Sequence, residues 1–191
     1  MEILTTPNPK LREKSSKVNK ITDETREIVD QMIKANLEWE KKHPYELSAA
    51  MAAPQMGFMK RIVVIRDDLD DKKNTSYTAL IDPEVIKTEG KFKKDYEGCL
   101  SVPKIYCLFT RPHKARIKAK LIDGTEVRIK TEGGLTRTLL HEIDHLDGKL
   151  FIDYIKDDAD AWFELNQKGD IVPIDYEKQI KNNKDLFPDE D

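Results

Sequence analysis

The sequence predicts an α+β fold in which antiparallel β-sheets pack around a central helix. An N-terminal helix and a C-terminal appendage complete the expected fold. Segments with alternating apolar and polar residues and strong turn signals fill the middle of the chain. One amphipathic helical pattern precedes them, and one largely apolar helical pattern follows. Strands that come in bulk, rather than alternating with helices, favour an antiparallel sheet.

The N-terminal part predicts an extended arm followed by a helix. Residues 5–20 are polar and contain two prolines. Thr22 can cap the helix, Glu24 lies in its first turn, and the apolar periodicity runs to about His43.

Strands are expected over residues 61–65, around 78–86 and around 114–122. Asp123-Gly124 is a strong hairpin signal, and EVRIK at 126–130 forms the returning strand.

The second helix is expected from about Leu135 to Leu146, after the break at Gly133-Gly134. Residues 1–155 are expected to form the catalytic domain, and residues 156–191 a C-terminal extension of unknown role. Within the extension, DADAWFEL at 158–165 could form a short helix.

Composition excludes several classes of protein. The chain has 191 residues, a length that suits one compact domain, and its net charge of -3 is mixed in sign, so charge alone predicts no nucleic-acid partner. It shows neither an apolar run of membrane-spanning length nor the apolar core of a signal peptide. Only two cysteines occur, Cys99 and Cys107, so a disulfide scaffold is not expected. We therefore expect a cytoplasmic protein without a membrane partner.

The segment HEIDH at 141–145 carries the strongest chemical signal. Residues four apart lie on one face of a helix, so His141 and His145 can share one metal ion. Glu142 lies a little further round the helix, where it can reach a water molecule on that ion. An ordinary half-buried histidine pair would have the same spacing. The apolar residues of the surrounding helix favour a metal site over such a pair, because buried polar groups need partners.

A catalytic site of this type needs a third protein ligand. Glu164, 19 residues after His145, would fill that role in a thermolysin-type endopeptidase. Cys99, in the tight segment EGCLS, is the other candidate, or else a buried structural thiol.

Three segments together resemble the peptide deformylase family: EGCLS at 97–101, HEIDHLDG at 141–148 and AAPQ at 52–55. The similarity extends from about Leu4 to Ile155. The resemblance implies that Cys99, His141 and His145 hold one divalent metal ion. Iron(II) is the first expectation, with zinc(II), nickel(II) or cobalt(II) as alternatives.

The resemblance also implies the reaction, which is removal of the N-formyl group from the initiator methionine of nascent polypeptides. Glu142 would move the proton of the attacking water, and the amide of Gln55 and the backbone N–H of Leu100 would stabilise the oxyanion. The implied partners are N-formylmethionyl peptides at the ribosome exit, and a monomer is expected.

Substrate binding is expected to involve Ala50, Gly98 and Ile143, with apolar residues lining a methionine pocket. Ser48 and Ala50 stand where the family's first motif has glycines.

Two further positions depart from the family pattern. Leu140 replaces a common glutamine, and Tyr106 replaces an arginine that helps to hold the peptide, a loss for which Arg111 could compensate. A working metal site with altered peptide binding is therefore expected. The alternatives are a related protein with a changed acyl substrate or no activity, and the thermolysin-type endopeptidase.

Overall fold

The computed structural model describes residues 2–43, 46–69, 71, 73–166 and 168–188. It confirms an α+β fold built on one seven-stranded sheet in which every strand pairing is antiparallel. The strand order is β1-β2-β3-β4-β6-β7, and β5 pairs with β4 at a separate point. The strands are β1 Ala50–Ala52, β2 Ile62–Arg66, β3 Tyr77–Cys99, β4 Val102–Lys120, β5 Glu126–Glu132, β6 Trp162–Leu165 and β7 Ile171–Pro173.

Helix α1 (Asp23–Lys42) begins at Thr22, as expected. The Thr22 hydroxyl accepts a hydrogen bond from the backbone N–H of Thr25, and the Thr25 side chain accepts one from the backbone of Thr22, so two N–H groups at the helix start are satisfied. The buried face of α1, which includes Ile28 and Met32, packs against β1, β2 and the start of β3.

Strands β1 and β2 and the start of β3 are buried on both faces because each face meets a helix. Alternate residues point to opposite sides of a strand. Ile62 and Val64 face the core under α1, whereas Val63 and Ile65 face the core under the second helix. This explains why RIVVI is a continuous apolar run.

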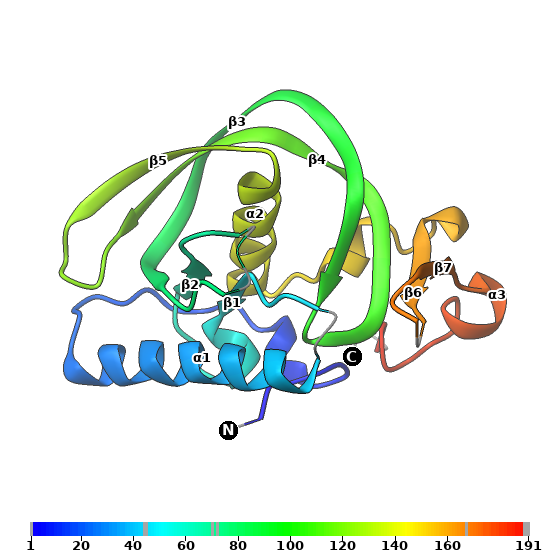
Figure 1. Ribbon diagram of the computed structural model, residues 1–191, viewed down its shortest axis with the longest axis horizontal. Coiled ribbons are helices and arrows are strands. Elements are labelled where there is room, and N and C mark those ends of the chain that lie inside the picture. The colour runs from blue at the N-terminus through cyan, green and yellow to red at the C-terminus, as the bar shows by residue number, and fades with distance from the viewer. Residues whose placement is uncertain (1, 44–45, 70, 72, 167, 189–191) are drawn as a thin grey trace.

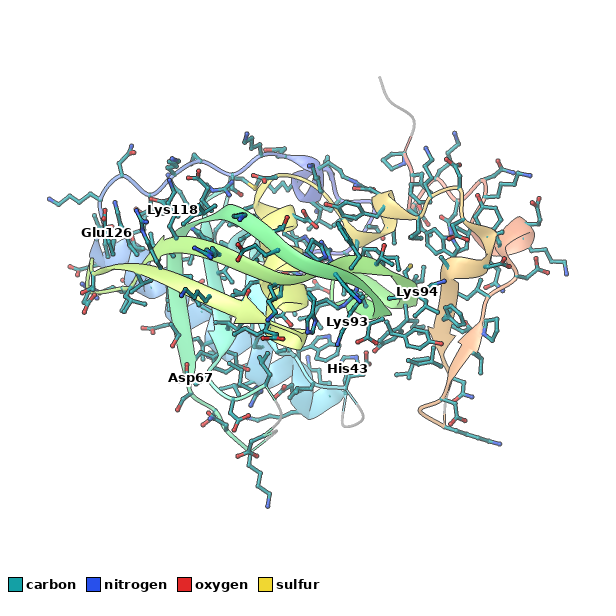
Figure 2. All side chains as sticks on the ribbon, turned by 90° about the horizontal axis from the view of Figure 1, so that it is seen from above. His43, Asp67, Lys93, Lys94, Lys118 and Glu126 are labelled. Atoms are coloured by element: carbon teal, nitrogen blue, oxygen red, sulfur yellow. The ribbon has the colours of Figure 1, made fainter. Side chains whose placement is uncertain are left out.

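Strands β3 and β4 form one long hairpin that arches over helix α2 (Gly134–Leu146), with β5 extending the arch (Figure 1). They are much longer than expected, because register shifts along β3 bend the hairpin without ending it. The outer face of the arch is rich in charge. Lys118 and Glu126 lie toward one end of it, and Lys93 and Lys94 toward the other (Figure 2).

Helix α2 lies under this arch and buries its apolar side in the sheet. It begins after Gly133, whose φ of 65° is a left-handed conformation that favours glycine. The buried apolar residues of α2 in this core are Leu139, Ile143 and Leu146. No helix within the described ranges has the length and apolar character required to cross a membrane.

The C-terminal segment continues the sheet. The helix expected at 158–165 is wrong: Trp162–Leu165 is strand β6, which pairs with Ile105 to Cys107 of β4. Trp162 is buried in a core with β4, the short helical turn Phe151–Tyr154 and residues near Leu186. Strand β7 and the short helix α3 (Tyr176–Gln179) follow. The boundary expected at residue 155 therefore falls within one continuous apolar core, and whether it separates two functional units stays a prediction.

We expect Trp162→Ala to lower the free energy of unfolding by about 3–5 kcal/mol, because it leaves a large cavity between β6 and β4. Urea unfolding followed by circular dichroism measures this. The control Ile171→Ala, at a side chain 37% exposed in β7, should change stability far less. If Trp162→Ala lowered the free energy of unfolding as little as the control does, β6 would contribute little to the core.

Candidate metal centre and pocket

Three side chains meet where the end of β3 faces helix α2. One donor atom each from Cys99, His141 and His145 lies within 4.8 Å of the other two. The Sγ atom of Cys99 is 3.1 Å from Nε2 of His145. Both histidine side chains are buried, and Cys99 is partly buried. A thiolate and two imidazoles suit zinc(II), iron(II) or nickel(II), so the donor set fits a divalent transition metal.

Glu164, the other candidate for a third ligand, lies elsewhere. It is on strand β6, opposite Ile105, and the only group of metal-binding side chains within the described residues is the cysteine and the two histidines. The observed geometry therefore gives the thermolysin-type arrangement no support.

Glu97 orients the first histidine. Its Oε1 atom is 2.6 Å from Nδ1 of His141, which leaves Nε2 of that ring free for a metal. A carboxylate at Nδ1 fixes the tautomer and makes the imidazole a stronger donor. Glu97 and Cys99 are two residues apart on one strand, so they point to the same side of β3.

Two arginines hold Glu97 in turn. Arg111 donates to both carboxylate oxygens at 2.7 and 2.8 Å, and Arg137 donates to Oε2 at 3.0 Å. Arg111 also donates to Asp144 of α2 at 2.8 Å. Burial acts to raise the pKa of Glu97, but the charges and hydrogen bonds of His141 and Arg111 outweigh it and hold this pKa well below its usual value.

This network bears on the expectation that Arg111 helps to hold the substrate peptide. Its side chain is buried, it binds Glu97 and Asp144, and it does not line the pocket beside the donor group. Arg111 therefore does not compensate for the arginine that Tyr106 replaces.

Glu142 is buried in the pocket wall next to His141. Its Oε2 atom has no hydrogen-bond partner among the described residues. Burial is the main cause that raises the pKa of Glu142 to about 7 in the metal-free protein. A buried carboxyl group with one unpaired oxygen is suited to exchanging a proton with a bound molecule.

Gln55 is anchored so that its amide NH₂ points to the same place. Its Oε1 accepts from the backbone N–H of Ala52 at 2.8 Å. Its Nε2 lies 3.7 Å from Cys99 Sγ and donates to the Ser101 hydroxyl at 3.2 Å. Leu100, between these two residues in the chain, also lines the pocket.

The pocket is a cavity of about 240 Å³ that includes most of the expected site residues. Its walls come from the end of α1, the segment before β1, strands β3 and β4, and helix α2. The lining residues include Trp39, Glu46, Ala50, Gly98, Tyr106, Arg137 and Thr138.

Ile143 is not part of this pocket, although it was expected to be. It is buried in the core between α2 and the sheet, with Ala50 and Leu80. Two residues along a helix correspond to a rotation of about 200°, so Ile143 points away from the side that His141 occupies. The residues of α2 that line the pocket beside His141 and Glu142 are Arg137 and Thr138.

The replaced glycines are compatible with the backbone. Among the described residues, only Asp82 and Lys104 combine a side chain with a positive φ, so neither Ser48 nor Ala50 needs a left-handed conformation. Ser48 is tied to α1, since its N–H donates to Glu40 at 2.8 Å and its hydroxyl donates to Asn36.

Tyr106 lines the pocket beside Gly98. Its hydroxyl donates to Glu46 at 2.7 Å, and a Cβ atom added at Gly98 would lie 2.6 Å from its ring. Any larger residue at position 98 would force the Tyr106 ring to move, which gives a physical reason for the glycine before Cys99.

Sequence reasoning missed Glu97, Arg137 and Thr138. The strand period connects Glu97 with Cys99, and the helix spacing connects Arg137 and Thr138 with His141. The link from Glu97 to Arg111 crosses between strands, and no local pattern indicates it.

A sheet that covers a helix bearing H-E-x-x-H beside a pocket is typical of metal-dependent hydrolases. The family model for polypeptide deformylase matches residues 1–161. The chain is 34% identical over 187 residues to the peptide deformylase of Rickettsia akari (96% of this chain, 97% of the relative). It is 40% identical over 148 residues to that of Halothermothrix orenii (78% of this chain, 88% of the relative).

Solved structures agree. The deformylase of Synechococcus elongatus in complex with actinonin is 31% identical with a TM-score of 0.71, covering 80% of this chain and 77% of that one. The deformylase of Legionella pneumophila is 32% identical with a TM-score of 0.70, covering 80% and 83%. The chain belongs to the polypeptide deformylase family.

We expect Glu97→Gln to weaken zinc(II) binding by about 10–100-fold, because His141 loses the carboxylate that orients it. The change also leaves Arg111 partly unpaired, so the free energy of unfolding should fall by about 3–5 kcal/mol. Competition with a coloured chelator and urea unfolding measure the two effects. The exposed control Glu132→Gln should change neither by much. Unchanged metal affinity in Glu97→Gln would contradict this role.

Proposed function

We propose that this protein is a metal-dependent hydrolase that removes the N-formyl group from the initiator methionine of nascent polypeptides. Water adds its hydroxyl to the formyl carbon, the C–N bond breaks, and formate and a free amino terminus result. One observation carries the proposal: the thiol and the two imidazoles converge, and two of these groups, Cys99 and His141, line one pocket together with Glu142 and Gln55.

The proposed ligands are Cys99, His141 and His145, holding one divalent ion. Iron(II) is the first candidate, with zinc(II), nickel(II) or cobalt(II) as alternatives, since these donors suit all four. When bound, such an ion lowers the pKa of a water molecule and polarises a carbonyl group. Three protein ligands leave a position open, as in catalytic rather than structural sites.

Glu142 is proposed to take the proton of the attacking water and to give it to the departing amine. Its unpaired oxygen and its place next to His141 support this role. The Gln55 amide and the backbone N–H of Leu100 are the proposed donors to the oxyanion. Because Ala52 holds the Gln55 oxygen, the amide NH₂ is already oriented before substrate arrives.

The proposed setting is the ribosome exit in the cytoplasm, where N-formylmethionyl chains emerge, with the protein acting as a monomer. Residues 1–155 are proposed as the catalytic unit, with 156–191 as an extension that packs against it. The alternative of a changed acyl substrate has support from one observation, the polar residues that α2 contributes to the pocket.

We expect the protein, purified without oxygen and loaded with iron(II) or nickel(II), to release formate from formyl-Met-Ala-Ser. Glu142→Ala should reduce the rate by about 10²–10⁴-fold with metal still bound, because the proton carrier is lost. Formate release and metal content are both measured, with exposed Glu126→Ala as control. A fully metallated protein that releases no formate would sink the proposal for this substrate.

Cys99→Ala should abolish tight metal binding, whereas Glu164→Ala should leave it unchanged. Metal content after gel filtration, by atomic absorption, distinguishes the two. The opposite pattern would revive the thermolysin-type ligand set and remove Cys99 from the proposed centre.

A further inference from the structure

Residues 47–50 form the pocket wall between helix α1 and the sheet, and all four of them line the cavity. Only Ala50 belongs to a strand, where it pairs with Ile65 of β2. The Ala49 carbonyl still accepts a hydrogen bond from the backbone N–H of Arg66 at 2.8 Å, but the ladder goes no further. The beginning of this wall therefore depends on other contacts for its position.

Ser48 supplies those contacts through all three of its polar groups. Its N–H donates to Glu40 Oε1 at 2.8 Å, its hydroxyl donates to Oδ1 of Asn36, and its carbonyl accepts from the Tyr77 hydroxyl at 3.4 Å. Ser48 and Asn36 are both buried, with 2% and 0% of their surface exposed. Because each polar group of Ser48 is bonded to the protein in a buried setting, the residue makes the wall rigid.

The groups that bind Ser48 are themselves fixed. Asn36 and Glu40 are four residues apart in α1, so they lie on the same side of the helix, one turn apart. Both carboxylate oxygens of Glu40 accept from Arg66 of β2 at 2.7 Å, and the Arg66 side chain is fully buried. Hydrogen bonds between two charged groups are short and strong. Helix α1 and strand β2 therefore share one anchor, and the pocket wall is attached to it at Ser48.

A glycine at position 48 would lack part of this attachment. It has no hydroxyl to donate to Asn36, and its backbone has more conformational freedom to lose on folding. The backbone at Ser48 does not have a positive φ, so a serine is accommodated there without strain. The serine that stands where the family's first motif has glycine thus adds a bond between the pocket wall and α1.

Resting on the proposed function, we propose that Ser48 is a positioning residue that, with Asn36 and Glu40, holds residues 47–50 in the conformation that binds the formylated peptide. The wall is ordered before the peptide arrives, so binding does not have to supply that ordering. None of the three side chains belongs to the group of metal-binding donors. Their effect therefore falls on peptide binding, and the proton transfer proposed for Glu142 is unaffected.

The first test measures formate release from formyl-Met-Ala-Ser by the nickel(II)-loaded wild type, Ser48→Ala and Ser48→Gly. In Ser48→Ala, KM should rise by about threefold to tenfold, which corresponds to one hydrogen bond, while kcat stays within about twofold. Ser48→Gly should raise KM further, because it also frees the backbone. The control Ser15→Ala removes another buried hydroxyl, one without a partner in the described part of the chain, and should change neither constant. An unchanged KM, or a loss that lies in kcat, overturns the proposal.

A double-mutant cycle identifies the partner of the hydroxyl. In an Asn36→Ala background the Ser48 hydroxyl has already lost its acceptor, so adding Ser48→Ala should raise KM no further. An equal rise in both backgrounds overturns the link to α1. If circular dichroism shows that Asn36→Ala does not fold, Ser48→Ala decides the matter through hydrogen exchange.

Hydrogen exchange separates this proposal from the function on which it rests, because it needs no substrate. Mass spectrometry of the metal-loaded protein should show faster amide exchange in residues 47–50 of Ser48→Ala than in the wild type, and no change there in Ser15→Ala. Calorimetry with metal-loaded Glu142→Ala, with and without Ser48→Ala, measures the affinity for formyl-Met-Ala-Ser without turnover. Faster exchange and weaker binding support the proposal even if the wild type releases no formate, an outcome that counts against deformylation alone. Unchanged exchange or equal binding overturns it.

Discussion

The structure depends on one buried carboxylate, that of Glu97. It joins strand β3 to helix α2 by bonding His141, and it joins β3 to β4 by bonding Arg111. A buried charge is stable only when paired and fully hydrogen-bonded. Arg111 and Arg137 meet that requirement. Two arginines bring two positive charges, and Asp144, which accepts a hydrogen bond from Arg111, supplies a second negative charge. Cys99, two residues further along β3, is thereby held opposite the two histidines.

The two sides of helix α2 face two different environments, the apolar core and the pocket. The sheet requires an apolar surface, and the pocket requires groups that bind and react. Because successive residues turn by about 100°, one helix of 13 residues can present both. The consequence is that a residue between His141 and His145 is not automatically near the substrate. Ile143 belongs to the core for this reason, and the pocket beside the histidines takes its character from the preceding turn.

Local signals identified the parts of the molecule that local physics determines. Thr22 caps α1, Asp123-Gly124 turns the hairpin, and HEIDH lies on a helix, because each depends on neighbours in sequence. The length of β3 could not be predicted, since long-range pairing with β4, which continues through several register shifts, sustains it. Strand β6 was mistaken for helix because its pairing with β4 is long-range and overrides weak local preference. The contacts of Glu97 were equally inaccessible, because they join segments far apart in the chain.

Strand β6 also sets an order of events during synthesis. It pairs with β4 at Tyr106, and Phe163 packs edge-on against Tyr96 of the pocket wall at 5.1 Å between ring centroids. A chain made from its N-terminus folds only what has left the ribosome. Both histidines proposed as metal ligands therefore emerge before the strand that contacts the β3 and β4 side of the pocket. An enzyme proposed to process the beginnings of other chains would complete its own binding site only after strand β6 has been made and has paired with β4.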